Sequence, residues 1–253
     1  MPITIKNDGL SILVLPDSSD FSDQLHANWF DAEYWRKQNK ISGESKGRHT
    51  TWFVKSGKAS HFEEQQWALR HYFRGGLIAK FITDSFLFTG IKNTRAYREV
   101  LLLKTMKNLG LPVPRVIGAQ VVRKGLFYSA DLLTEKLEGS DLVTQLKVKP
   151  LSKENWYIVG KVIGKFHQHG IYHSDLNSHN IMIQEKAHST NVWLIDFDKC
   201  EQRTVKKLYK NSWKNDNITR LYRSLVKEKG VFPSINFDEG NWSELVRGYN
   251  SAL

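Results

Sequence analysis

The chain has 253 residues, of which 40% are apolar and 12% aromatic, which argues against a disordered protein. Lys and Arg number 37 against 26 Asp and Glu, and the net charge of +11 favours an anionic partner. Cys200 is the only cysteine, which excludes an internal disulfide and makes the cytosol the expected compartment. The most apolar later stretch, 77–91, contains Lys80 and Asp84 and is shorter than the roughly 20 residues of a membrane span. Any membrane association is therefore expected to be peripheral.

The first 135 residues are expected to be rich in strands. Short apolar segments bounded by turn residues predict strands at 11–15, 50–55, 67–73, 116–122 and 126–133. Apolar residues recur at helical spacing from Ala96 to Met106, which predicts one helix over 94–109 that ends at Gly110.

The rest of the chain is expected to be mainly helical. A helical stripe of apolar residues begins after Ser152, a suitable N-cap, and ends before Gly170. Two short strands follow, at 180–183 and 192–195, and basic amphipathic helices are expected from Arg203 onwards. These patterns predict an α+β protein with two lobes.

A polar loop followed by an acidic strand end carries the chemistry. The sequence H-S-D-L-N-S-H-N occupies 173–180, and L-I-D-F-D follows at 194–198. The pair resembles the catalytic loop and the metal-binding aspartate of protein-kinase-like enzymes. Phosphoryl transfer needs a carboxylate that orients the attacking hydroxyl, and oxygen ligands that hold Mg²⁺ against the nucleotide phosphates. Asp175 suits the first role, whereas Asn180 and Asp196 suit the second.

Departures from the protein-kinase pattern restrict the class of molecule that can accept the phosphate. Ser174 stands where many protein kinases have arginine, and Asn177 replaces the usual catalytic-loop lysine, with His179 nearby. His173 is expected to brace the loop by hydrogen bonding. The chain after Asp198 is short and has no A-P-E element, which disfavours a protein substrate and favours a small-molecule kinase.

The N-terminal half offers candidates for binding the nucleotide phosphates. Glu99 lies on the predicted helix, where it can face the interior and position a cation. Arg70 occupies the strand position where lysine is usual, and Lys80 is the alternative cation. Gly43 and Gly47 precede a strand but do not form the G-x-G-x-x-G pattern of a phosphate-covering loop.

Three segments together resemble the lipopolysaccharide-core sugar kinases over roughly residues 45 to 200. They are the run R-H-Y-F-R-G-G-L at 70–77, Arg98-Glu99 with the following G-L-P-V-P, and the Asp175 and Asp196 motifs. The resemblance implies a protein-kinase-like fold, with a nucleotide-binding lobe at 1–135 and a catalytic lobe at 136–253.

The same resemblance implies the reaction. The γ-phosphate of ATP, with Mg²⁺, would pass to the 4-hydroxyl of 3-deoxy-D-manno-octulosonic acid (Kdo) on lipid IVA. The acceptor would be at the cytoplasmic face of the bacterial inner membrane, whose anionic surface would favour a basic protein.

A basic stretch at 203–229 has two interpretations. Apolar and aromatic side chains alternate with its basic ones, which are Arg203, Lys206, Lys207, Lys210, Lys214, Arg220, Arg223, Lys227 and Lys229. The pattern is typical of an interfacial membrane helix. It is equally typical of a solvated basic face whose aromatic residues pack onto the lobe.

Two other functions remain open. A related kinase such as a heptose kinase would share the nucleotide residues and differ in its acceptor surface. The charge and the eight tryptophans also fit a non-enzymatic nucleic-acid-binding protein. That hypothesis leaves Asp175, Asn180 and Asp196 without a role, so no nucleic acid is expected. The oligomeric state does not follow from the sequence.

Overall fold

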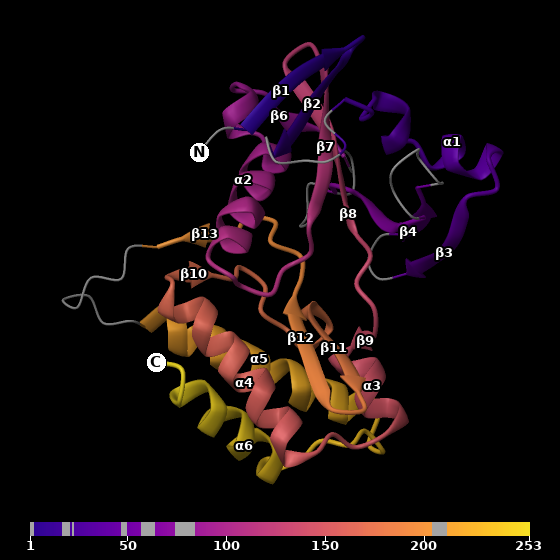
Figure 1. Cartoon of the computed structure of the whole chain (residues 1–253). Helices are drawn as coiled ribbons and strands as arrows, with labels where there is room; N and C mark the ends of the chain where they lie inside the picture. Colours follow the sequence, from indigo (N-terminus) through magenta and orange to yellow (C-terminus); the bar gives the residue numbers. More distant parts are fainter. Residues whose placement is uncertain are drawn as a thin grey trace. The chain divides into compact units, whose positions relative to one another are not determined.

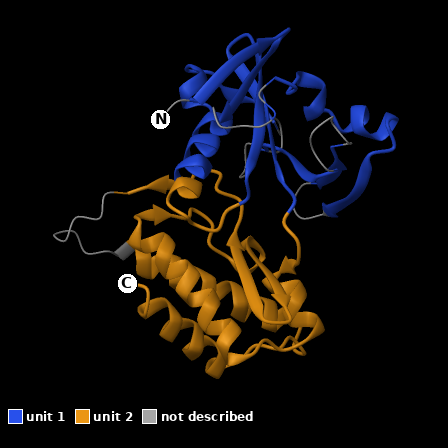
Figure 2. Ribbon diagram, in the orientation of Figure 1, with its two compact units in different colours: residues 1–105, 114–136 blue, residues 106–113, 137–253 orange. Residues whose placement is uncertain are grey.

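The computed structural model describes residues 3–16, 21, 23–46, 50–56, 64–73, 84–203 and 212–253. The chain forms two compact units (Figure 2). The first contains 1–105 and 114–136, and the second contains 106–113 and 137–253. The division at 136 lies one residue from the predicted boundary, but the sequence does not predict that 106–113 belong to the second unit.

The first unit is built on an eight-stranded antiparallel sheet in the order β1-β2-β7-β8-β5-β4-β3, with β6 paired to β8 (Figure 1). Its strands are β1 (Ile3–Asp8), β2 (Ser11–Pro16), β3 (Ile41–Lys46), β4 (Thr50–Lys55), β5 (Gln66–His71), β6 (Phe86–Leu87), β7 (Val116–Lys124) and β8 (Phe127–Glu135). Its helical segments are η1 (Ala27–Phe30), α1 (Ala32–Lys37), η3 (Ile91–Asn93) and α2 (Arg95–Asn108), the last of which continues into the second unit.

The sequence predicts the inner strands of this sheet and misses its edges. β1 and β3 lie at the two ends of the strand order, where each pairs with a described strand on one side only. Such strands do not need a continuous apolar run. β6 has two residues and α1 has six, so neither is long enough to show a periodic pattern.

The two faces of β5 have different neighbours. Trp67 and Leu69 point to one face and are buried in an aromatic cluster with Trp29 and Trp35 from η1 and α1. Because successive side chains of a strand alternate, Arg70 points to the opposite face, where α2 supplies its partner.

The second unit is mainly helical. Its helices are α3 (Leu142–Val148), α4 (Lys153–Gln168), α5 (Ser212–Val231) and α6 (Glu239–Asn250), with a short 3₁₀ turn, η4 (Ser178–Asn180). Its strands form two small sheets, one of β9 (Ser140–Asp141), β11 (Ile181–Lys186) and β12 (Ser189–Leu194), the other of β10 (Ile171–Tyr172) and β13 (Glu201–Gln202). Ser152 caps α4, as predicted, by accepting a hydrogen bond from the Asn155 backbone N–H at 3.1 Å. Within the described ranges, none of the helices combines the length and apolar character that a membrane span requires.

The pairing of α4 with α6 requires glycine at the contact. The two helices lie side by side (Figure 1), and a Cβ atom added at Gly160 would overlap the backbone carbonyl of Leu245. Since a backbone carbonyl cannot rotate away, the helices would have to separate.

We expect Gly160→Ala to destabilise the protein by at least about 1–3 kcal/mol, because overpacking at a backbone contact forces the helices apart. The melting temperature of the full chain should fall by several degrees. Gly230→Ala in α5 is the matched control, since an added Cβ there meets no atom within 4 Å. It should leave the melting temperature unchanged or raise it. Equal effects of the two substitutions would contradict the role given to Gly160.

Candidate active site

Residues 173–180, the loop that resembles a kinase catalytic loop in sequence, connect β10 to β11 and are called the catalytic loop below. The hairpin of β11 and β12 pairs Ile181 with Leu194. The ladder continues one step further, where the Ile195 backbone N–H donates to the Asn180 carbonyl at 3.0 Å. Asn180 and Asp196 therefore lie at the same end of this hairpin, as the sequence predicts.

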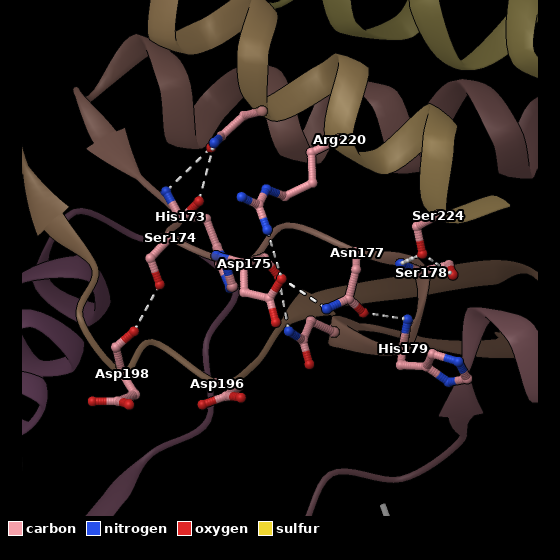
Figure 3. A network of polar contacts seen from close by, with 12 residues as sticks. His173, Ser174, Asp175, Asn177, Ser178, His179, Asp196, Asp198, Arg220 and Ser224 are labelled. Atoms are coloured by element: carbon pink, nitrogen blue, oxygen red, sulfur yellow. Dashed lines mark hydrogen bonds and ion pairs between the residues drawn. The ribbon is translucent and has the colours of Figure 1, made fainter. Parts of the chain in front are cut away.

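His173 joins the catalytic loop to the strand that leads to Asp196. Its Nε2 donates to the Ile195 carbonyl at 2.9 Å. Its Nδ1 accepts from the backbone N–H of Asp175 at 3.2 Å, and the two residues are neighbours in Figure 3. The imidazole must be neutral to make both contacts, because a backbone N–H can only donate. Burial lowers the pKa of His173, which agrees with a neutral ring. The bracing role predicted for His173 corresponds to this geometry.

Asp175 presents its carboxylate to solvent while its backbone is fixed. Its carbonyl accepts from the side-chain amides of Asn177 at 3.1 Å and Asn180 at 2.9 Å. Its side chain is 49% exposed, and Oδ1 accepts from Nη1 of Arg220 at 3.0 Å. A carboxylate held in this way can orient a hydroxyl group and accept its proton.

Helix α5 binds the catalytic loop through a row of side chains along one face. Residues three and four apart on a helix lie on the same side, and each member of this row contacts a successive part of the loop. The pairs are Asn217 with His173, Arg220 with Asp175, Ser224 with Ser178 and Glu228 with His179.

The buried member of the row is Asn217, whose side chain makes two bonds to one residue. Its Oδ1 accepts from the His173 backbone N–H at 3.2 Å, and its Nδ2 donates to the His173 carbonyl at 3.0 Å. Four residues before Glu228, the hydroxyl of Ser224 accepts from the Ser178 backbone N–H at 3.2 Å. The loop thus takes its shape from a helix that follows it by about forty residues in the sequence.

Sequence reasoning missed this row because the region around it is basic. One feature of the sequence could have revealed the row: Asn217 and Ser224 are polar residues on the apolar side of the helix. They lie next to Leu221 and Leu225, which are fully buried. For α5, the burial of Leu221 and Leu225 supports the second interpretation of 203–229, in which apolar side chains pack onto the lobe. Trp213, near the start of α5, also packs within the unit, edge-on against His167. Residues 204–211 lie outside the described part of the chain.

His179 lies between two carboxylates at the outer end of the loop. Nδ1 is 3.2 Å from Asp141 Oδ1, and Nε2 is 3.2 Å from Glu228 Oε1. The hydrogen bond to Asp141, with burial opposing it and Glu228 adding to it, raises the pKa of His179. Burial acts to raise the pKa of Asp141, but hydrogen bonds from His179 and Thr144 lower it overall. A protonated His179 therefore ties the catalytic loop to the start of α3 and to α5.

The residues at the hairpin end fit a magnesium ion. Mg²⁺ prefers one or two oxygen-bearing side chains and completes its shell with water and substrate phosphates. The amide nitrogen of Asn180 is bound to the Asp175 carbonyl, which leaves its Oδ1 to act as a ligand. Asp196 has a positive φ of 63°, a costly conformation for a residue other than glycine and one that is common at functional sites. In the described ranges, no three His, Cys, Asp or Glu side chains gather as a metal cluster, so phosphates and water would complete the coordination.

The first unit brings together two of the predicted phosphate-binding residues. Arg70 Nη2 lies 2.6 Å from Glu99 Oε1, and the Tyr72 hydroxyl donates to Glu99 Oε2 at 2.8 Å. Glu99 is only 3% exposed, whereas Arg70 is 25% exposed. Glu99 therefore holds the guanidinium from inside the unit. Lys80 and Gly47 lie outside the described residues.

We expect His179→Gln to reduce stability in a pH-dependent way. The ordinary pKa of histidine is about 6.5, and the folded value is higher, so the charged contacts stabilise fully below about pH 6.5. Their contribution is lost as the pH rises through the folded pKa. The melting-temperature difference between wild type and variant should therefore be larger at about pH 6 than at about pH 8.5.

His188→Gln is the control for this comparison, because His188 is exposed in the turn between β11 and β12. Its difference from wild type should stay small at both pH values. A His179→Gln effect that grows with pH would show that the two carboxylates do not hold an imidazolium.

Comparison with known proteins agrees with this geometry. The family model described as "Lipopolysaccharide kinase (Kdo/WaaP) family" matches residues 32–249. A 3-deoxy-D-manno-octulosonic acid kinase of Mannheimia succiniciproducens is 42% identical over 88% of this chain and 90% of its own length. The enzyme of the same name from Photobacterium profundum is 43% identical over 87% of each chain.

A solved structure confirms the predicted fold. The protein described as WaaP in complex with acyl carrier protein superposes with a TM-score of 0.55 over 94% of this chain and 88% of that one, at 13% identity. The α+β protein-kinase-like architecture is thus confirmed. By the extent of the family match and the identity to these relatives, this chain belongs to the lipopolysaccharide kinase (Kdo/WaaP) family.

Proposed function

We propose that this protein transfers the γ-phosphate of ATP to the 4-hydroxyl of Kdo in Kdo-lipid IVA, a step of lipopolysaccharide inner-core biosynthesis. The observation that carries the proposal is the fixed loop that presents the Asp175 carboxylate beside the hairpin end with Asn180 and Asp196. The relatives named as Kdo kinases supply the choice of acceptor.

Asp175 acts as the base in this proposal. It accepts a hydrogen bond from the attacking hydroxyl, orients it, and takes its proton during transfer. His173 keeps the Asp175 backbone in register with Ile195 and does not exchange protons, because its ring is neutral and both nitrogens are bound.

Asn180 and Asp196 are the proposed ligands of Mg²⁺. When bound, the ion neutralises charge on the nucleotide phosphates. Arg70, positioned by Glu99, is the proposed contact to the α- and β-phosphates, because its guanidinium can bind phosphate oxygens bidentately. Lys80 remains the alternative cation.

We expect Asp175→Ala to reduce transfer by about 10²–10⁴-fold, the range typical of a lost general base, with nucleotide binding nearly unchanged. Asp196→Ala should lose transfer and also weaken Mg²⁺-dependent nucleotide binding, because a metal ligand is removed. Transfer is measured from labelled ATP onto Kdo-lipid IVA, with mapping of the phosphorylated hydroxyl, and nucleotide binding by calorimetry.

Asp216→Ala is the matched control, since Asp216 is exposed on α5. It should behave as wild type. Near-normal turnover of Asp175→Ala would show that Asp175 is not the base. Phosphate found on a heptose, with Kdo unmodified, would establish a different acceptor within the same family.

We also propose that the protein works as a peripheral protein at the anionic inner-membrane surface, on the cytoplasmic side. The net charge of +11 supports this, since each basic residue near an anionic leaflet contributes about 1 kcal/mol. The buried apolar face of α5 argues that attraction by charge, and not insertion of this helix, would dominate.

Sedimentation with lipid vesicles tests the membrane proposal. The protein should bind vesicles that contain anionic lipid, should not bind purely zwitterionic ones, and should dissociate as salt is raised toward about 1 M, where the Debye length is about 3 Å. Binding that is insensitive to both lipid charge and salt would contradict an electrostatic attachment.

A further inference from the structure

We propose that Arg220 binds the carboxylate of the acceptor sugar and so sets the position of the acceptor hydroxyl against Asp175. This inference rests on the proposed function, in which the acceptor is an acidic sugar. It assigns Arg220 to the recognition of substrate, in addition to its contact with the loop.

Arg220 is placed where an acceptor must come. Its Nη1 lies 3.0 Å from Asp175 Oδ1, so any hydroxyl that Asp175 orients is within a few ångströms of the guanidinium. The two side chains are 48% and 49% exposed, so both are open to a ligand. Among the described residues, Asp175 is the only hydrogen-bond partner found for this guanidinium, whereas an arginine has five N–H donors.

The side from which Arg220 approaches favours the acceptor over the nucleotide. In Figure 3, Arg220 reaches Asp175 from α5, whereas Asp196 lies on the other side of Asp175. Mg²⁺ and the phosphates it carries belong with Asp196 in the proposed function. The positive charge of Arg220 therefore lies on the side of Asp175 that is left for the acceptor sugar and its hydroxyl group.

The chemistry of the acceptor matches this pair of side chains. Kdo is a 3-deoxy sugar acid, and its carboxylate and 4-hydroxyl are carried by ring carbons that are two apart. A side chain that binds the carboxylate and a neighbouring one that binds the hydroxyl would fix the ring in one orientation. The planar fork of a guanidinium suits a carboxylate because it can make two parallel hydrogen bonds.

Within residues 173–180, the one protonated side chain is held by groups other than Asp175. Asn177 carries no charge at the position of the usual catalytic-loop lysine. His179 is held between Asp141 and Glu228, as shown above. Arg220 is the cation that the described residues place on the carboxylate of Asp175.

The test compares two acceptors on wild type and variants. The acceptors are Kdo-lipid IVA and an analogue in which the Kdo carboxylate is converted to a neutral carboxamide. The variants are Arg220→Gln, which removes the charge, and Arg220→Lys, which keeps it without the fork. Arg223→Gln is the matched control, because Arg223 is exposed on α5 three residues further along. The kcat/KM is measured for each protein with each of the two acceptors. Nucleotide binding and melting temperature serve as checks of folding.

The kcat/KM of the wild type should be about 10–100-fold higher on the natural acceptor than on the carboxamide. This is the factor expected from the loss of a hydrogen bond to a charged group. Arg220→Gln should lose about that factor on the natural acceptor and discriminate little between the two, and Arg220→Lys should be intermediate. Arg223→Gln should match wild type.

Two results would overturn the inference. If Arg220→Gln lost activity equally on both acceptors, Arg220 would act on the phosphoryl group or on the loop itself. If wild type used both acceptors equally well, the carboxylate would not be recognised. Both outcomes leave the proposed function intact, whereas a wild-type protein that transfers phosphate to neither acceptor would refute that function as well.

Discussion

The catalytic loop depends on one buried amide, that of Asn217. With 2% of its surface exposed, this side chain satisfies both the N–H and the carbonyl of His173. Losing it would leave two buried backbone groups unpaired, at about 1–3 kcal/mol each. His173 in turn holds the backbone of Asp175 and the carbonyl of Ile195. The position of the proposed base therefore follows from a contact between α5 and the residue two places before it.

Two histidines in this loop show how environment divides their roles. His173 is buried among backbone groups, which lowers its pKa and keeps it neutral. Six residues later, His179 lies between two carboxylates, which raises its pKa. One imidazole thus fixes geometry as a neutral group, with a pKa below the ordinary value for histidine, and the other is a charged link that weakens as the pH rises. The inner end of the loop is therefore held by contacts of a neutral ring, and the outer end by contacts of a charged one.

Local sequence signals were sufficient to predict which candidate residues lie together where one segment or one hairpin positions them. Asp175, Asn180 and Asp196 fall on a loop and a hairpin of fewer than thirty residues, and Glu99 follows from helical spacing. Arg220 and Asn217 could not be found in this way, because their partners lie more than forty residues earlier and a tertiary contact decides which face of α5 is buried. The edge strands β1 and β3 were not predicted for a related reason, because a partly buried strand does not need a continuous apolar run.

The exposed ion pair of Arg220 and Asp175 suits a residue that must exchange partners. Ion pairs with this degree of exposure typically stabilise a protein by less than about 1 kcal/mol, because water and salt screen them. An acceptor carboxylate can therefore draw the guanidinium into a second contact at little cost. A lysine on the loop itself would move with the loop, whereas Arg220 projects from a helix that Asn217 and Ser224 already fix to it. Supplying the cation from α5 therefore places the charge beside the proposed base on an element that is itself bonded to the loop.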